Sequence, residues 1–156
     1  MLINGTTLVR RLITQNAKNP EYVSKLVDTL LTIHQLRADN YPKYAVTARN
    51  NRGLDVANYI KNNPKRSLEE YNAIIEANKQ ETKPNIFIFQ MQAALDLNEK
   101  GEIAPEDLIQ MYQQGISYID KAPAKDAEEA AANKKTKTDL ERLFTSSKVA
   151  SCDNLI

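Results

Sequence analysis

Gly53-Leu54-Asp55-Val56 and Ala94-Leu95-Asp96-Leu97 repeat one pattern inside two segments that prolines open. The pattern is a small residue, an aliphatic residue, an aspartate and a second aliphatic residue, and its second copy begins 41 residues after its first. Pro42 precedes the first copy and Pro84 precedes the second. Such a period is typical of helical repeat arrays, in which each hairpin of helices buries its apolar face against its neighbours. The repeat predicts an all-α stack of antiparallel helical hairpins, an α-solenoid.

Start and stop signals divide the chain into about seven predicted helices. Asn19 and Pro20 combine an N-cap with proline at the first helical position, which opens a helix. Ser67 and Glu70 have the spacing of a capping box, and we expect a helix to begin there and the preceding one to end before Pro64. Gly101 is placed to end another helix in the left-handed conformation. The predicted helices cover residues 6–16, 20–40, 45–61, 67–80, 84–100, 105–121 and 125–146.

The C-terminal part of the chain is less apolar than the rest. Residues 125–137 are rich in Ala, Glu and Lys, which suits a solvated helix and a mobile linker equally well. Because residues 138–144 restore an apolar face, we expect one helix with a thinly packed first half. Residues 151–156 resemble a cap and the first turn of a further helix, so residues 1–156 are interpreted as a single helical-repeat domain from a longer protein. Self-association through an uncovered apolar end is then expected, and this end comprises Leu143, Phe144, Leu155 and Ile156.

Composition excludes several classes of function. The chain has 156 residues, with 21 basic and 20 acidic side chains, and its net charge of +1 creates no strong field toward nucleic acid. Its apolar runs, such as residues 86–89, are far shorter than the ~20 residues of a membrane-spanning helix. The first residues lack the pattern of a signal peptide, which indicates a cytosolic protein or one whose leader has been removed. We therefore expect neither a nucleic-acid partner nor a membrane-spanning segment.

The residues that could support catalysis do not assemble a site in the sequence. His34 is the only histidine and lies in a segment dense in apolar residues, so we interpret it as a packed or capping side chain. Cys152 has no recognisable partner for nucleophilic chemistry or for zinc. Asp55 and Asp96 occupy equivalent points of separate repeats, which favours solvated positions or hydrogen bonds across a hairpin over an acid–base pair. We expect no enzyme activity, no cofactor and no metal.

The helical pattern also resembles a known family. Proline-ended helices and pairs such as Tyr112-x-x-Gly115 are similar to degenerate tetratricopeptide repeats. More narrowly, the chain resembles the N-terminal region of exported tetratricopeptide-type proteins of Gram-negative gut bacteria. This resemblance implies further repeats after Ile156, protein binding and a periplasmic or outer-membrane location, while the sequence alone leaves a cytoplasmic location open. In that family a cysteine at the place of Cys152 can pair with one further along the chain. The stretches that carry the narrower resemblance are residues 26–31, Arg37, Tyr41-Pro42, Gly53-Leu54-Asp55 and residues 151–156.

The resemblance also implies a binding face. The family's groove positions correspond to Thr47, Asn50 and Asn58 in one segment, and to Asn98 and Glu99 in its repeat. Polar side chains there could bond an extended backbone, although a solvated helix face would show the same pattern. Two interpretations stay open: a non-catalytic scaffold that binds a protein or peptide through a concave face, and a structural spacer of a cell-envelope assembly with an empty groove.

Overall fold

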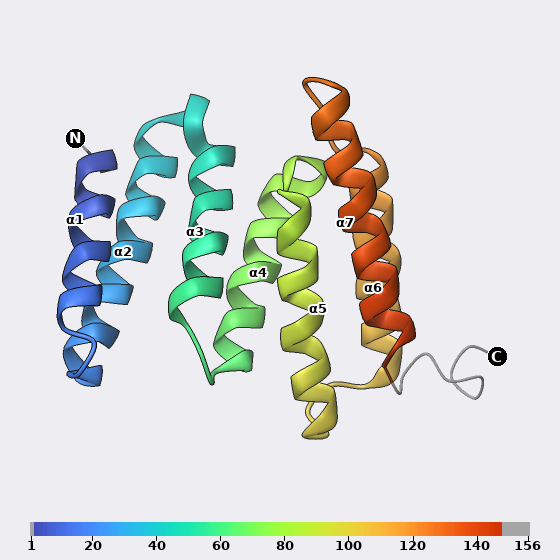
Figure 1. Ribbon diagram of the computed structural model, residues 1–156, viewed down its shortest axis with the longest axis horizontal. Coiled ribbons are helices and arrows are strands. Elements are labelled where there is room, and N and C mark those ends of the chain that lie inside the picture. The colour runs from blue at the N-terminus through green and yellow to red at the C-terminus, as the bar shows by residue number, and fades with distance from the viewer. Residues whose placement is uncertain (1, 148–156) are drawn as a thin grey trace. The chain divides into compact units, whose positions relative to one another are not determined.

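The computed structural model describes residues 2–147 and, among their side chains, those from residue 5 onward (Figure 1). Within this range every regular element is helical, which confirms the predicted all-α fold of packed helices. The solenoid geometry stays a prediction, and the further helix expected at residues 151–156 lies outside the described residues. The α-helices are α1 (Leu2–Gln15), α2 (Pro20–Asn40), α3 (Ala45–Tyr59), α4 (Pro64–Asn78), α5 (Pro84–Glu99), α6 (Pro105–Asp120) and α7 (Ala127–Thr145), with two 3-10 helices, η1 (Pro42–Tyr44) and η2 (Lys79–Glu81).

The chain forms two compact units. The first, Met1–Lys61, contains α1, α2, η1 and α3, and the second, Asn62–Ile156, contains α4, η2, α5, α6 and α7. Each unit has its own packed helices. The single helical-repeat domain over residues 1–156 stays a prediction.

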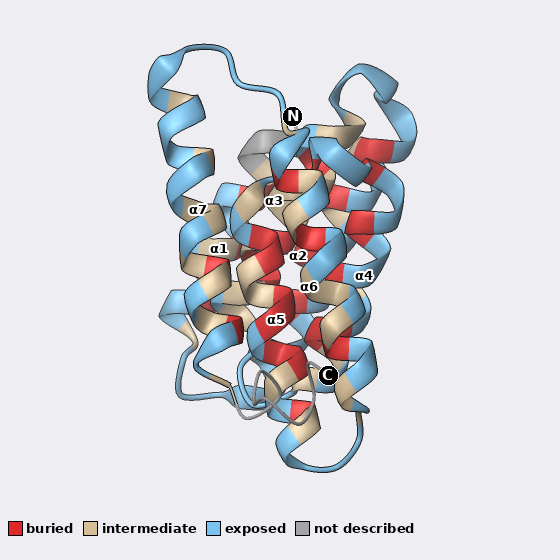
Figure 2. Cartoon of the chain, turned by 90° about the vertical axis from the view of Figure 1, so that its right-hand side faces the viewer, coloured by how far each residue is buried: buried red, intermediate tan, exposed pale blue. Residues whose placement is uncertain are grey.

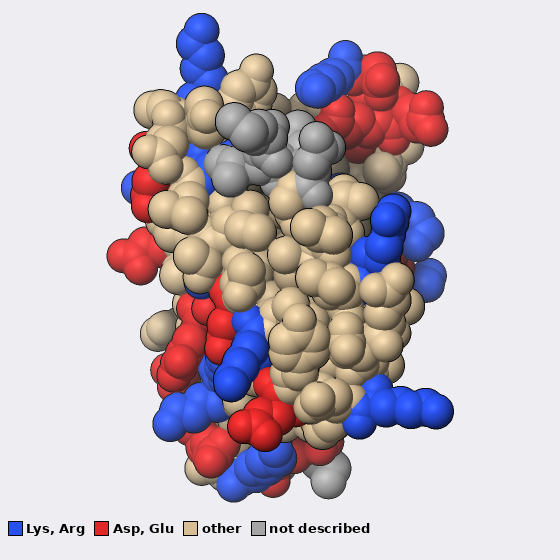
Figure 3. Space-filling model, turned by 90° about the vertical axis from the view of Figure 1, so that its left-hand side faces the viewer, with Lys and Arg blue, Asp and Glu red and all other residues tan. Residues whose placement is uncertain are grey.

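In the first unit, α2 packs against both α1 and α3 (Figure 1). Its buried residues cover a broad arc, because two neighbours need two apolar faces. α2 is therefore sandwiched between α1 and α3. Figure 3 views the side on which α1 and α2 lie, where the centre of the surface is free of Lys, Arg, Asp and Glu. The buried residues of α2 are Leu26, Val27, Leu30, Leu31, His34 and Ala38.

In the second unit, α5 is the central helix and packs against α4, α6 and α7. Buried positions occur along most of its length (Figure 2), and Ala94, the small residue of the repeated pattern, is completely buried. Gly115 lets α6 approach α5 and α7 closely, since a Cβ there would lie 3.1 Å from Leu140 Cδ2 and 3.5 Å from Phe87 Cδ1. The buried residues of α5 are Ile86, Phe87, Gln90, Met91, Ala93, Ala94 and Leu97.

α7 has the thinly packed first half that its composition predicts. None of residues 127–139 is buried, whereas Leu140 and Phe144 are (Figure 2). The ring of Phe144 stacks on Tyr112 of α6, with the ring centres 4.3 Å apart. The expectation that Phe144 belongs to an uncovered apolar end is therefore wrong, because the aromatic ring of Tyr112 covers it.

Two predicted helix ends are confirmed in detail. Asn19 caps α2, and its side-chain oxygen accepts a hydrogen bond from the backbone N–H of Tyr22 at 3.2 Å. After α5, Gly101 has a φ of 77°, and the N–H of Glu102 bonds back to the carbonyl of Leu97 at 2.9 Å. This bonding satisfies carbonyl groups that the end of a helix leaves without partners.

The predicted start of α4 is wrong. The helix begins at Pro64 rather than at Ser67, and the side-chain oxygen of Asn63 accepts a hydrogen bond from the N–H of Arg66. Ser67 is buried one turn inside the helix. The reason is that Asn63 and Pro64 repeat the opening signal of Asn19 and Pro20. The sequence predicts that the preceding helix runs to Lys61 and stops ahead of Pro64, but α3 ends earlier, at Tyr59.

Asn63→Ala is expected to lower the free energy of unfolding by about 1 kcal/mol, because one N–H at the start of α4 loses its acceptor. Asn63→Asp keeps an acceptor and places a negative charge at a helix N-terminus, so it should preserve stability. Urea unfolding followed by circular dichroism measures both variants. Equal stability of Asn63→Ala and the wild type would show that the cap contributes nothing.

Candidate functional site

Two hollows on the surface of the second unit meet at Ile103. The larger has a volume of about 400 Å³ and the smaller of about 240 Å³. We call the two together the Ile103 groove, because Ile103 lines both. The larger hollow is lined by Lys65, Leu68, Glu69, Asn72, Leu97, Glu102 and Ile103, and the smaller by Ile103, Asp107, Gln110, Met111 and Gln114.

The helices on the two sides of the groove contribute matching faces. α4 and α6 each supply positions i, i+3, i+4 and i+7, which lie on one side of an α-helix. Each position on α6 follows its counterpart on α4 by 42 residues, close to the 41-residue period of the aspartate pattern. α5 packs against both helices. The groove is therefore framed by corresponding positions of α4 and α6, with α5 between the two helices in the chain. The two sets are Lys65, Leu68, Glu69, Asn72 and Asp107, Gln110, Met111, Gln114.

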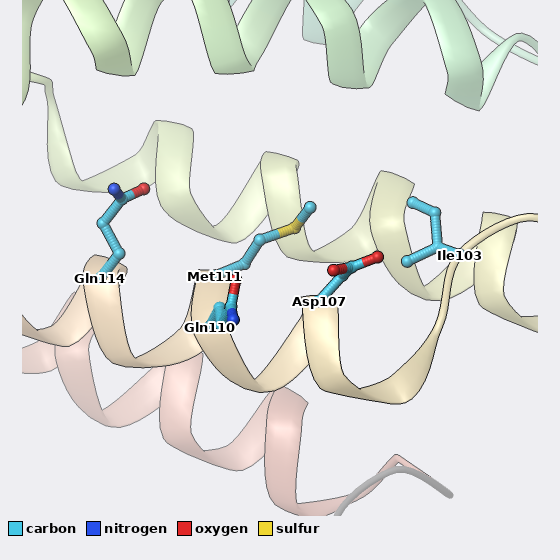
Figure 4. A pocket seen from close by; sticks show the side chains of 5 residues that line it. All are labelled: Ile103, Asp107, Gln110, Met111 and Gln114. Atoms are coloured by element: carbon cyan, nitrogen blue, oxygen red, sulfur yellow. The ribbon is translucent and has the colours of Figure 1, made fainter.

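The groove has an apolar base and a polar rim. Leu68 and Leu97 are buried at its base, and Ile103 is half-buried between the two hollows. Figure 4 shows Asp107, Met111 and Gln114 reaching from α6 into the space beside α5, with Ile103 at one end. An apolar centre with a polar rim is the usual anatomy of a protein–protein interface.

Two amide side chains, on Asn98 and Gln90, fix the positions of residues that line the groove. Asn98, at the end of α5, donates a hydrogen bond from Nδ2 to the carbonyl of Ile103 at 2.9 Å, which fixes the loop that carries Ile103. Buried Gln90 donates from Nε2 to Oδ1 of Asn72 at 2.8 Å, which orients the Asn72 amide on the wall of the larger hollow. Asn72 itself is exposed, so its NH₂ group can donate a hydrogen bond to a ligand.

The rim carries an excess of negative charge. Glu69, Glu102 and Asp107 are exposed, and none of their carboxylates forms an ion pair or hydrogen bond within the described residues. Lys65 is the single cation among the lining residues. The three carboxylates are therefore free to interact with a cationic group.

The residues predicted from the resemblance belong to both units. Thr47, Asn50 and Asn58 are on one side of α3 in the first unit, where Thr47 and Asn58 are exposed and Asn50 is half-buried. Asn98 and Glu99 are at the end of α5 in the second unit, and Glu99 is exposed. None of the five lines the Ile103 groove, although Asn98 positions it. A continuous row of the five along a concave face stays a prediction.

A polar cluster around buried Asp55 and His34 joins the three helices of the first unit. Asp55 on α3 accepts two hydrogen bonds from Arg10 of α1. Nε of Arg10 lies 3.0 Å from Oδ1, and Nη2 lies 2.7 Å from Oδ2. His34 of α2 lies 2.6 Å from the same Oδ2 through its Nε2. Since a carboxylate only accepts, Nε2 of His34 carries the proton. Burial raises the pKa of Asp55, but the hydrogen bonds from His34 and Arg10 together outweigh burial and leave that pKa below its ordinary value.

The two aspartates of the repeated pattern have different surroundings. Asp55 forms the hydrogen bonds across helices that the sequence allowed, whereas Asp96 is exposed, as the solvated alternative predicts. His34 is buried among packed helices, which confirms its interpretation as a core side chain. The sequence gives no signal for the partnership of His34 with Asp55, because the two residues are 21 positions apart in different helices.

The described residues also bear on metal binding and on membrane-spanning helices. Among the described residues, no cluster of three or more His, Cys, Asp or Glu side chains is arranged to hold a metal ion. Over the same range, no helix combines the length and the apolar character needed to cross a membrane. Cys152 lies outside the described residues.

Comparison with protein-family models, with curated proteins and with solved structures finds no match to this chain.

Proposed function

We propose that this chain is a non-catalytic, tetratricopeptide-like scaffold that binds a segment of another protein in the Ile103 groove. The observation that carries the proposal is the pair of matching faces on α4 and α6, which frame two adjoining hollows with an apolar base. Pockets of this kind take the anchor side chains of a partner, while a polar rim excludes water around them. Helical repeats use such surfaces to hold a bound segment across several helices.

The proposal includes no chemistry. His34, the single histidine, is buried and bonded to Asp55, so it is not placed to exchange protons with a substrate. The face that carries Thr47, Asn50 and Asn58 is a second candidate surface for the same function, supported by the family resemblance. That resemblance alone supports a periplasmic or outer-membrane location. The alternative role as a spacer predicts that the Ile103 groove stays empty in the cell.

Photo-crosslinking in cells that naturally produce the protein tests this function. A photoreactive phenylalanine analogue replaces Gln110 or Gln114 in the groove, and Gln113 serves as the control because it is exposed on another side of α6. We expect the same partner protein to be captured from Gln110 and Gln114 and not from Gln113. Capture that is equal at all three positions, or none at the two groove positions, would favour the spacer.

A further inference from the structure

The charges around the Ile103 groove specify the chemistry of its occupant. We propose that the groove takes a basic protein segment in which an arginine or lysine lies within a few residues of an aliphatic or aromatic side chain. This inference rests on the proposed function and deepens it. It requires an apolar anchor site, a cation site next to it, and a rim that rejects acidic segments.

The larger hollow supplies the anchor site. Buried Leu68 and Leu97 form its base, and half-buried Ile103 forms one side. An aliphatic or aromatic side chain placed there removes apolar surface of both partners from water, at roughly 25 cal/mol per Å². The NH₂ group of exposed Asn72, whose oxygen accepts a hydrogen bond from Gln90, can donate to a backbone carbonyl of the segment.

The smaller hollow supplies the cation site. Asp107 offers a carboxylate without an ion-pair partner among the described residues, and the side-chain oxygens of Gln110 and Gln114 can accept further hydrogen bonds (Figure 4). The apolar surfaces of Ile103 and Met111 suit the aliphatic stem of a long basic side chain. Arginine is favoured over lysine, because its planar fork can bond a carboxylate and an amide oxygen together.

The rim supplies the selectivity. Glu69 and Glu102 border the larger hollow and Asp107 the smaller, so a basic segment meets carboxylates on both sides of Ile103. An acidic segment would meet like charges at the same places, which disfavours it. Lys65 is the one lining cation and does not offset three carboxylates.

A phage-displayed library of random dodecapeptides, selected on the full chain, tests the inference. We expect the enriched peptides to contain arginine or lysine near an aliphatic or aromatic residue and few acidic residues. Asp107→Asn should weaken the binding of a synthetic peptide from this set by about five- to tenfold at low salt. The same variant should bind the analogue in which norleucine replaces arginine as well as the wild type does. Asp96→Asn is the matched control, since Asp96 is exposed on α5 and does not line the groove.

A second variant, Ile103→Asn, removes the apolar centre without changing the charge, and it separates failure of this inference from failure of the proposed function. Peptides that lose binding to Ile103→Asn but show no basic preference would overturn the inference and leave groove binding intact. An Asp107→Asn variant that distinguishes arginine from norleucine as well as the wild type does would have the same meaning. Peptides insensitive to Ile103→Asn, or no enriched peptide at all, would contradict both proposals. Circular dichroism establishes that each variant is folded.

Discussion

Asp55→Ala is expected to lower the free energy of unfolding of the first unit by about 2–3 kcal/mol, because it leaves the buried His34 donor without an acceptor and removes the ion-pair partner of half-buried Arg10. His34 would keep a buried ring without an acceptor for its Nε2 proton, and Arg10 would lose a bidentate partner. Hydrogen exchange of α1, α2 and α3, together with urea unfolding, measures the loss.

Asp96→Ala is the matched control for this prediction. Asp96 occupies the equivalent place in the repeated pattern but is exposed, so its removal should change stability by no more than about 0.5 kcal/mol. Equal losses for the two variants would contradict the structural role of the polar cluster.

The same cluster predicts how stability depends on acid. Because the pKa of Asp55 is lower in the folded chain, its contribution to stability is present above the unfolded value near 3.8 and is lost as the pH falls through the folded pKa. The stability difference between the wild type and Asp55→Ala should therefore be constant near neutral pH and shrink below that value. A difference that stays constant down to the acid unfolding transition would contradict this linkage.

Phe87→Ala is expected to destabilise the second unit by about 3–5 kcal/mol. Phe87 is 1% exposed, lies against Gly115 and places its ring centre 6.1 Å from that of Tyr118, so truncation leaves a cavity between α5 and α6. Phe89→Ala is the matched control, because Phe89 is half-buried on the same helix and should cost less. Thermal unfolding of both variants measures the two losses, and equal losses would contradict the central packing of α5.

Local signals in the sequence predicted most helix boundaries. Asn19 with Pro20, and Gly101 after α5, act through their immediate neighbours, so their effects can be read from a few residues. Asn63 with Pro64 carries the same opening signal as Asn19 with Pro20. A proline can follow one helix or open the next, so Pro64 also fits the end of the preceding helix, and the sequence does not decide between the two.

The candidate site depends on contacts between helices that are distant in the sequence, and local patterns do not predict such contacts. Asp55 and Asp96 share one local pattern, yet only Asp55 has Arg10 and His34 beside it, and these come from helices distant in sequence. The 42-residue relation between the faces of α4 and α6 is present in the sequence, but their residue types differ. A comparison of residue types at corresponding positions therefore does not reveal the groove. The groove forms because α5 packs against both helices.

Binding in the Ile103 groove is tested most directly by the affinity of the partner captured from Gln110 for the purified wild-type protein and for Ile103→Asn. We predict that Ile103→Asn weakens binding by at least about tenfold, a loss of roughly 1.4 kcal/mol or more, since it places a polar amide at the apolar centre of the groove without changing the charge. Its helical content should stay that of the wild type, because Ile103 is only half-buried in a loop. Titration calorimetry that finds equal affinity for the two proteins would contradict binding in the Ile103 groove.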